Sequence, residues 1–323
     1  MFFKRLIPDP FVLGLLATLV LASFFPATGI FAVAIAWLAK FAIVMLFFFL
    51  GAKLSRNSII DGISHWRLHL TIFGSTFLIF PLIGLAFSLL LSGLLPPILW
   101  VGVLYLAALP STVQSSIAFT SIAGGNVSAA ITAASASQVI GVFLSPLLVS
   151  LLVGVQGASL PISSLGKIVL LILVPFIIGH LLRPLLASWV ARNKGIVSIT
   201  DRTTILLAVY SAFSAAVIEG IWTRLPISTL LMLLLICSVI LVIMLSATHR
   251  LAKFFTFNRE DSISIVFCGT KKSLVQGVPM ASILFAGPDL GMILLPAMIF
   301  HQIQLMVCAY IARHYSLNEN NQG

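Results

Sequence analysis

Residues 263–285 read ISIVFCGTKKSLVQGVPMASILF and place two adjacent lysines, Lys271 and Lys272, inside a long apolar stretch. An ionised side chain at the centre of a bilayer costs about 2.5–3.5 kcal/mol on insertion scales, so two in succession need water, an anion or protein walls around them. Gly269 and Pro279 favour a broken helix that lines a cavity. The alternative is a solvated loop outside the membrane. We favour the broken helix, and with it an intramembrane functional site.

The composition is that of a polytopic helical membrane protein. Hydrophobic residues make up 60% of the 323 residues, charged residues make up 8%, and the mean hydropathy is +1.17. A soluble chain carries about 25% charged residues, and a membrane β-barrel shows short alternating segments instead of long apolar runs. The net charge of +10 is scattered between apolar runs without interleaved aromatic residues, so we expect no nucleic-acid partner.

Cysteine spacing and the N-terminal residues narrow the class further. Cys237, Cys268 and Cys308 lie in apolar runs without metal-binding spacing, so we expect buried free thiols, no metal site and no cofactor. Lys4 and Arg5 precede the first apolar run, and no small-residue cleavage site follows it. We therefore expect that run to be retained as a helix and not removed as a signal peptide.

The apolar runs predict ten transmembrane helices in an all-α fold. A spanning helix needs about 20 apolar residues, and glycine and proline mark the turns between them. Lysine and arginine gather in alternate loops, so the positive-inside rule predicts that both termini are cytoplasmic, in a bacterial inner membrane. The predicted spans are 10–26, 31–53, 67–92, 97–122, 126–153, 165–185, 203–222, 226–249, 261–286 and 290–313, with a cytoplasmic tail at 314–323.

Five spans fall on each side of a loop around residues 154–164, within what we predict is a single transporter domain over the whole chain. This predicts two five-helix repeats, at 10–153 and 165–313. Because each repeat has an odd number of spans, the second is inverted relative to the first, as in many secondary transporters. The fourth and ninth spans then correspond, and both are interrupted, at 110–116 and 269–273. Matched interruptions predict a binding site near the middle of the membrane.

Six segments carry a resemblance to a known family: FFP at 24–26, GAKLS at 51–55, LPSTVQSS at 109–116, GGN at 124–126, FCGTKKSL at 267–274 and FHQIQ at 300–304. Through them the chain resembles the bile acid:sodium symporter family, and in particular its SBF-like branch, over nearly its whole length. The resemblance implies a panel domain from spans 1, 2, 6 and 7 and a core domain from spans 3–5 and 8–10. It also implies that the discontinuous fourth and ninth helices cross within the core.

Sodium-coupled members of that family bind two sodium ions beside the crossing. Among their ligands are a glutamate and a glutamine on the ninth helix, and the resemblance places Phe267 and Lys271 at these two positions. No acidic residue occurs in 262–287, and sodium sites need oxygen ligands and usually some negative charge. We therefore expect sodium to bind weakly or not at all. The other sodium positions fall on Thr76, on Ser115 and Ser116, and on Thr132 with Ser135 or Ser137.

The candidate substrate- or ion-binding residues combine the two interruptions, the positions implied by the resemblance, and two polar residues of the tenth span. They are Thr76, Gln114, Ser115, Ser116, Thr132, Ser135, Thr270, Lys271, Lys272, Ser273, His301 and Gln302. Three roles stay open for the lysines. An ammonium group could replace a bound cation, could bind an anionic substrate with the help of helix N-termini, or could be a structural charge bonded to backbone carbonyls.

Other polar residues have simpler interpretations. His301 fits a hydrogen-bonded packing role better than that of a proton carrier. Glu219, which could pair with Arg224 near the outer end of the seventh span, is the carboxylate to test for proton coupling. Asn126 follows two glycines and fits a helix cap.

The functional prediction is a secondary active transporter that moves a small organic anion by alternating access, without an obligatory sodium gradient. The alternative is a channel, or a regulator of ion homeostasis, on the same fold. Nothing in the sequence resembles a catalytic triad, a phosphate-binding loop or a metal cluster, so we do not expect an enzyme.

Overall fold

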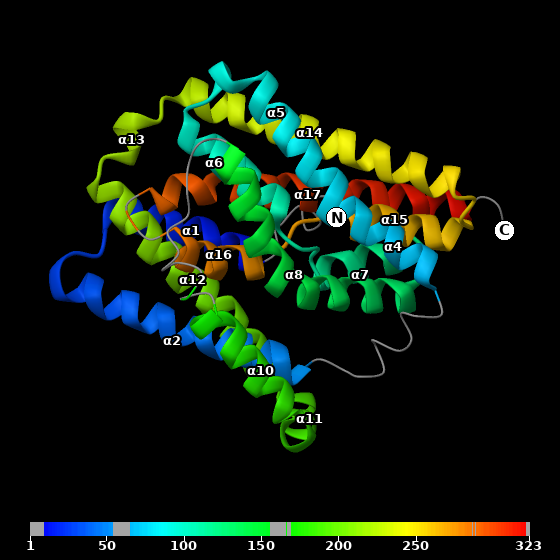
Figure 1. Ribbon diagram of the computed structural model, residues 1–323, viewed down its shortest axis with the longest axis horizontal. Coiled ribbons are helices and arrows are strands. Elements are labelled where there is room, and N and C mark those ends of the chain that lie inside the picture. The colour runs from blue at the N-terminus through cyan, green and yellow to red at the C-terminus, as the bar shows by residue number, and fades with distance from the viewer. Residues whose placement is uncertain are drawn as a thin grey trace. The chain divides into compact units, whose positions relative to one another are not determined.

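The structure is a computed structural model that describes residues 10–53, 65–155, 166, 169–285, 287 and 289–320. Every regular element among these residues is a helix (Figure 1). Lys4, Arg5 and most of the loop around residues 154–164 lie outside the described residues. The chain divides into two compact units, which are described separately below.

Six of the described helices are long and apolar enough to cross a bilayer, and a pair bent by 91° would make a seventh span. The chain is therefore an all-helical, multi-pass membrane protein. The remaining predicted spans consist of short helices of 9 to 15 residues, whereas about 20 are needed to cross alone. A membrane span that is divided into two short helices is not recognised when each helix is judged by its own length. The count of ten spans and the inverted repeat therefore stay predictions.

Unit 1 comprises Met1–Lys53, Gly166–Pro226 and Val278–Met292. Its helices are α1 (Pro10–Phe24), α2 (Gly29–Lys53), the π-helical turn η4 (Val169–Leu173), α10 (Val174–Leu181), α11 (Arg183–Arg192), α12 (Lys194–Ile218) and α13 (Ile221–Arg224). It also takes part of α16 (Leu274–Leu284) and the start of α17 (Leu290–Asn320).

Two glycines let α2 and α10 approach closely in unit 1, where Figure 1 shows the two helices crossing. A Cβ atom on Gly51 would lie 2.0 Å from the carbonyl oxygen of Phe176, and one on Gly179 would lie 2.0 Å from that of Phe48. Small residues of this kind are typical of membrane helix pairs, because close backbone packing replaces the hydrophobic driving force that lipid removes. The helix pair thus depends on the absence of two side chains.

Unit 2 comprises Leu54–Leu165, Ile227–Gly277 and Ile293–Gly323. Its helices are α4 (Trp66–Gly74), the π-helical turn η2 (Ser75–Ile79), α5 (Phe80–Leu90), the short 3₁₀ turn η3 (Ser92–Leu94), α6 (Pro97–Ala108), α7 (Gln114–Ile122), α8 (Val127–Val155), α14 (Ile227–Phe254) and α15 (Arg259–Thr270). The rest of α17 and the first turn of α16 complete it.

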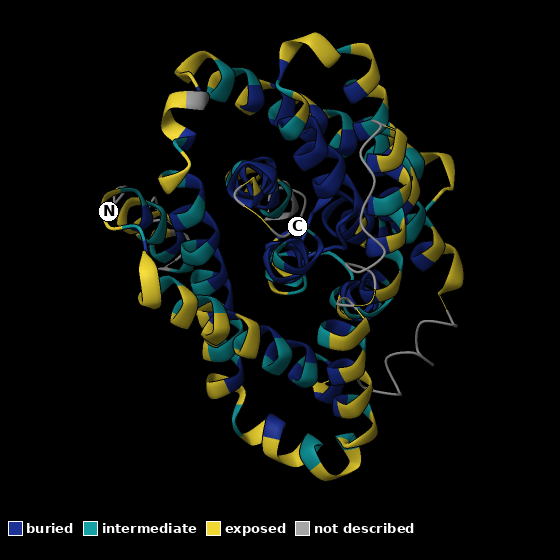
Figure 2. Ribbon diagram, turned by 60° about the vertical axis from the view of Figure 1, so that its left-hand side comes forward, coloured by how far each residue is buried: buried dark blue, intermediate teal, exposed yellow. Residues whose placement is uncertain are grey.

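The centre of unit 2 is formed by α6 and α15. All residues of α6 from Leu99 onward are buried, and so are all residues of α15 from Ile263 onward. By contrast, α14 exposes Leu231, Leu235 and Val242, an apolar face that meets lipid in a membrane protein. Figure 2 shows that some helices are buried along most of their length, whereas others carry stripes of exposed residues.

Two helices continue beyond the predicted membrane spans. The seventh predicted span begins at 203, but α12 begins at Lys194. The tenth predicted span ends at 313, but α17 continues to Asn320 through most of the predicted tail. Hydropathy marks where a helix leaves the hydrocarbon core of the bilayer. The helical hydrogen bonds can continue beyond that point into water, so the helix can be longer than the apolar run.

Two local predictions are confirmed. The side-chain oxygen of Asn126 accepts a hydrogen bond from the Ala129 N–H at 3.0 Å, which makes it the cap of α8. Cys237, Cys268 and Cys308 are buried free thiols.

Candidate functional site

The two predicted interruptions lie in unit 2, and prolines explain how they release backbone groups. The fourth span breaks between Ala108 and Gln114, where Leu109 is extended, as expected for a residue before proline. In a continuous helix the Ser111 N–H would bond to Ala107, but it donates instead to the Ser137 hydroxyl at 3.0 Å. The carbonyl of Ala107 is thereby left without its helical partner.

A second proline frees a carbonyl on the third span. The Phe80 N–H donates to the Ser75 carbonyl, five residues back, which is the π-helical pattern. The carbonyl of Thr76 would then need the N–H of residue 81, which is proline and has none. Thr76 is therefore left with an unused backbone oxygen at a fully buried position.

The freed carbonyls form a cage around Lys272, which is 2% exposed. Its Nζ donates to the carbonyl oxygens of Thr76, Ala107 and Leu109 at 2.8, 2.7 and 2.7 Å. The ring of Phe80 lies 4.2 Å from the same nitrogen and adds a cation–π contact. An ammonium group has three N–H donors, so three carbonyls satisfy it completely.

Lys271 is held differently, although its side chain is also fully buried. Its Nζ donates to the carbonyl oxygen of Ser115 at 2.8 Å. The same nitrogen lies 3.7 Å from the ring centre of Phe119 and 5.4 Å from that of Phe267. Within the described residues, the Lys271 ammonium thus contacts one oxygen atom and two aromatic rings, whereas the Lys272 ammonium contacts three oxygen atoms.

Besides the bond from Lys271 to Ser115, three hydrogen bonds join the first interruption to the second or to the end of α15 just before it. The Ser273 N–H donates to the Pro110 carbonyl at 2.8 Å. From the other side, the hydroxyls of Ser111 and Ser116 donate to the carbonyls of Cys268 and Phe267 at 2.6 and 3.2 Å. The breaks therefore contact each other, as two crossing discontinuous helices require.

Three glutamines that are absent from the predicted site support these backbone segments. Gln138 on α8 donates to the Ser111 carbonyl at 2.8 Å and to the Ser273 hydroxyl at 2.9 Å, so it bridges both breaks. Gln276 donates to the backbone of Gln138 at 2.9 Å. Gln304 on α17 bonds both backbone groups of Lys272. Each is a buried amide that lies in an apolar run of the sequence. A polar side chain in such a run is the sequence signal that could have identified these three residues.

The structure brings together most, but not all, of the predicted site residues. Thr76 and Ser115 contribute carbonyl oxygens that accept from the two lysines. Ser116 and Ser273 contribute hydroxyl groups to the contacts between the breaks. The Thr270 hydroxyl instead donates within its own helix to the Val266 carbonyl at 2.6 Å. His301 contacts Gln304 at 2.9 Å, in keeping with the expected packing role. The other four lie apart from these contacts among the described residues: Gln114 is exposed, Gln302 and Ser135 are half-buried, and Thr132 is buried on α8.

The electrostatics of the site are dominated by the two lysines. Within the described residues neither lysine lies within 4.0 Å of a carboxylate oxygen. Phe267, at the position that the resemblance matches to glutamate, is fully buried. No group of three or more metal-ligating His, Cys, Asp or Glu residues occurs in the described part of the chain. Glu219 lies at the end of α12 in unit 1, and the side chain of Arg224 lies outside the described residues.

Comparison with known proteins defines the class. The model of the SBF-like CPA transporter family matches residues 9–317. The chain belongs to the SBF-like CPA transporter family, which confirms the resemblance found in the sequence.

Individual relatives agree with this membership. The uncharacterized protein PA2026 of Pseudomonas aeruginosa is 53% identical over 313 residues, which cover 97% of this chain and 94% of that protein. The Escherichia coli protein named "Putative symporter YfeH" is 52% identical over 307 residues, 95% of this chain and 92% of its own. The mouse protein named "Sodium/bile acid cotransporter 7" is 30% identical over 270 residues, 82% of this chain and 79% of its own. The relatives with functional names are named as transporters.

Proposed function

We propose that this chain is a secondary active transporter of the bacterial inner membrane that moves a small organic anion by alternating access without a sodium gradient. Membership of a transporter family and the symporter and cotransporter names of two relatives support transport. Two buried ammonium groups without a carboxylate partner among the described residues support an anion as the substrate.

In this proposal unit 1 acts as the panel domain and unit 2 as the core domain. The segments of unit 1 include spans 1, 2, 6 and 7, and those of unit 2 include spans 3–5, 8 and most of 10, while the ninth span is divided between the two units after Gly277. The lysines, both interruptions and the three supporting glutamines all belong to unit 2. A site contained in one compact unit can move with that unit as a rigid body, which is what alternating access requires.

The observation that carries the proposal is the carbonyl cage of Lys272. Three backbone oxygens from two different spans point at one nitrogen, an arrangement that suits a bound monovalent cation equally well. The ammonium group of Lys272 therefore takes the place of a cation and keeps both breaks in the geometry that a cation would impose. A transporter with such a built-in charge needs no sodium ion for substrate binding.

Lys271 is the better candidate for the anion itself. Its Nζ has one oxygen partner among the described residues, so two of its three donors are not used by oxygen atoms. It contacts Ser115, which is half-buried and follows the exposed Gln114. An anion that reached this side would gain charge-assisted hydrogen bonds without dismantling the cage of Lys272.

Flux measurements on purified protein in liposomes test the proposal. Uptake of radiolabelled organic anions is measured in sodium, potassium and choline buffers, with Lys271→Gln and Lys272→Gln beside the wild type. We expect saturable flux that is equal in the three buffers and is reduced in both variants. A strict, saturable requirement for sodium would refute the built-in cation, and a high unitary conductance would favour the channel alternative.

A further inference from the structure

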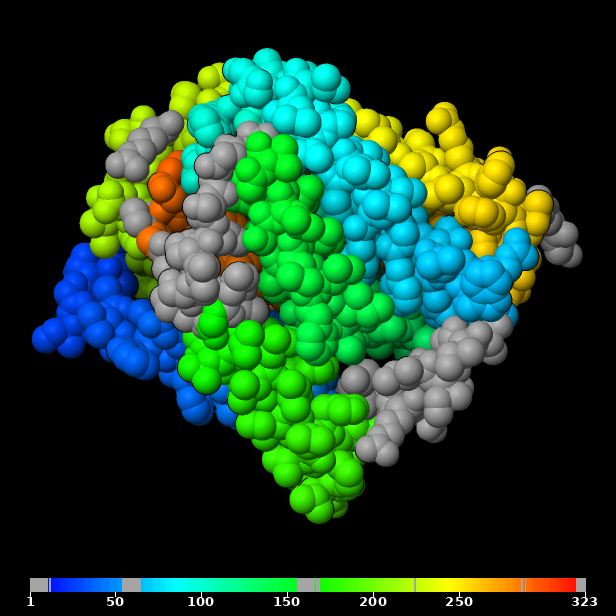
Figure 3. Space-filling view, viewed as in Figure 1, coloured from blue at the N-terminus to red at the C-terminus, as the bar shows by residue number. Residues whose placement is uncertain are grey.

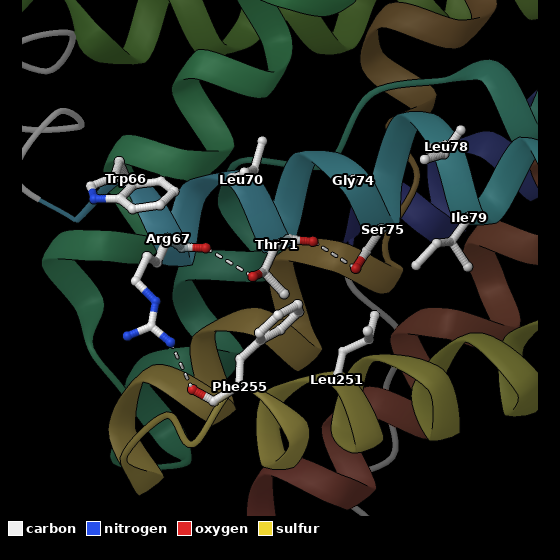
Figure 4. A pocket seen from close by; sticks show the side chains of 10 residues that line it. All are labelled: Trp66, Arg67, Leu70, Thr71, Gly74, Ser75, Leu78, Ile79, Leu251 and Phe255. Carbon is white, nitrogen blue, oxygen red and sulfur yellow. Dashed lines mark hydrogen bonds between the residues drawn. The ribbon is translucent and has the colours of Figure 1, made fainter.

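A groove on unit 2 lies between α4 with η2 on one side and the end of α14 on the other (Figure 4). Trp66 and Arg67 form one end, Leu78 and Ile79 form the other, and Leu251 lines the opposite wall. Figure 3 shows the surfaces of α4 and α14 side by side on one face of the molecule. The groove is separate from the lysine site, although it shares the π-helical turn with it.

The groove presents an apolar surface even where its lining residues are polar. The Thr71 hydroxyl donates to the Arg67 carbonyl at 2.8 Å, and the Ser75 hydroxyl donates to the Thr71 carbonyl at 2.7 Å. Both hydroxyls are thus satisfied within their own helix, as Figure 4 shows. A Cβ atom on Gly74 would meet no atom within 4 Å, so the glycine leaves the middle of the groove open.

Among the described residues that line the groove, the cationic one is Arg67, at one end. Arg67 is exposed, and one terminal nitrogen of its guanidinium donates to the Phe255 carbonyl at 3.2 Å. A guanidinium has five N–H donors, and within the described residues Arg67 forms no ion pair with a carboxylate. The neighbouring Trp66 is 62% exposed, and tryptophan concentrates where a membrane helix meets the headgroup region.

The length of the groove matches one leaflet of a bilayer. Arg67 and Leu78 are eleven residues apart, which is roughly 16 Å along a helix, and half of the hydrocarbon core is about 15 Å. The volume of the groove is ≈ 240 Å³, below the roughly 300–1,000 Å³ of pockets that enclose a drug-sized solute. The groove therefore suits a thin chain with an anionic end better than a compact molecule.

We propose that this groove binds an anionic phospholipid, with an acyl chain along Gly74 and the phosphate on Arg67. The groove lies next to the backbone that holds Lys272, without opening onto the lysine itself. Ser75 lines the groove, and Thr76, the next residue, supplies a carbonyl to the cage of Lys272. On the inner side, a Cβ on Gly269 would lie 3.1 Å from the Cβ of Ser75. A bound lipid therefore contacts the π-helical turn whose backbone holds Lys272.

Thermal unfolding of the full-length purified protein tests lipid binding without any transport assay. Short-chain phosphatidylglycerol, short-chain phosphatidylcholine and inorganic phosphate are titrated separately. We expect phosphatidylglycerol to bind about fivefold more tightly than phosphatidylcholine, because one arginine near the surface contributes about that factor. Inorganic phosphate should give no shift, because it lacks the chain. Equal shifts with both lipids, or a full shift with inorganic phosphate, would overturn the proposal.

Two pairs of variants locate the effect. Arg67→Gln should abolish the preference for phosphatidylglycerol, whereas Arg192→Gln should keep it; Arg192 is also exposed and also donates to one backbone carbonyl at 3.2 Å. Gly74→Leu should weaken both lipids by filling the groove, whereas Gly93→Leu should not, since both glycines have open space around them. A loss of preference in Arg192→Gln as well, or unchanged binding in Gly74→Leu, would refute this site. Because these are binding measurements, they stand or fall independently of the proposed transport function.

Discussion

The side-chain amide of Gln304 forms a pair of hydrogen bonds with the backbone of Lys272. The Lys272 N–H donates to the side-chain oxygen of Gln304 at 2.9 Å, and the side-chain nitrogen of Gln304 donates to the Lys272 carbonyl at 3.0 Å. A single amide thus satisfies both backbone groups of a residue that belongs to no helix. Buried backbone groups need such partners, and in the break between α15 and α16 the chain itself offers none to Lys272.

We predict that Gln304→Leu destabilises the protein more than Gln302→Leu. The first change leaves a buried N–H and a buried carbonyl without partners, at about 1–3 kcal/mol each, whereas Gln302 is half-buried on the same helix. Thermal unfolding in detergent measures the difference. Equal melting temperatures for the two variants would show that the amide clamp contributes nothing.

Removal of the Lys272 ammonium should expose a cation site. Lys272→Ala leaves the carbonyls of Thr76, Ala107 and Leu109 without a donor. We expect a lower melting temperature than wild type and partial recovery with millimolar sodium, potassium or methylammonium, since a cation that binds only the folded state stabilises it. The wild type should not respond to these salts at matched ionic strength. A variant that is equally indifferent to them would contradict the cage interpretation.

Pro81→Ala should weaken the same cage from the opposite side. The substitution adds an N–H that can bond to the Thr76 carbonyl within the π-helical turn, and that carbonyl now accepts from Lys272. We expect a helix that tolerates the change but a flux reduced several-fold. Pro279→Ala, inside α16, is the matched control for loss of a helix proline. Liposome flux with normal protein yield checks the prediction, and undiminished flux in Pro81→Ala would count against it.

The helix pair of unit 1 should not tolerate a side chain at Gly51. A Cβ there would lie 2.0 Å from the Phe176 carbonyl, so Gly51→Ala must push two backbones apart, which typically costs about 1–3 kcal/mol or more. Gly195→Ala is the control, because a Cβ at Gly195 meets nothing within 4 Å. Expression level and melting temperature of the two variants measure the effect. Equal values would show that α2 and α10 do not pack this closely.

Both termini are expected to face the cytoplasm. A green fluorescent protein fused to the C-terminus should fluoresce, and alkaline phosphatase at the same position should be inactive, because each reports one side of the membrane. The prediction follows from the basic residues gathered in alternate loops. An active phosphatase fusion would reverse the orientation.

The sequence is sufficient to predict where the helices break but not what fills the breaks. Pro110 and the pair Lys271–Lys272 mark both interruptions, since proline removes an N–H and a charge excludes an ordinary lipid-facing helix. The π-helical turn at Thr76 has no comparable signal, because Pro81 alone is compatible with a simple kink. The acceptor for Ser111 on α8 is Ser137 and not Ser135. Two residues rotate a helical side chain by about 200°, so the resemblance, which leaves Ser135 and Ser137 as alternatives, does not show which of them faces the break.

A glutamine in an apolar run indicates a buried polar contact, but the sequence does not show which backbone groups the amide bonds. Gln138 lies 27 residues from Ser111 and 135 from Ser273 in sequence, and no local pattern links positions so far apart. Gln304 belongs to the quoted segment FHQIQ, yet from sequence it is indistinguishable from Gln302. Only the fold shows that one of the two glutamines reaches the backbone of Lys272 and that the other does not.

The covalent tether of the Lys272 charge has an energetic consequence for the proposed transporter. A sodium ion that enters with its substrate gives up the free energy of its own gradient, whereas an ammonium on a side chain never leaves the protein and contributes nothing to the driving force. For a monovalent anion, an interior-negative potential of 100 mV is worth about 2.3 kcal/mol, equivalent to roughly a 50-fold concentration ratio directed outward. With no other coupled ion, a carrier built in this way would be a uniporter that favours export, so the proposed secondary active transport needs a coupled ion other than sodium.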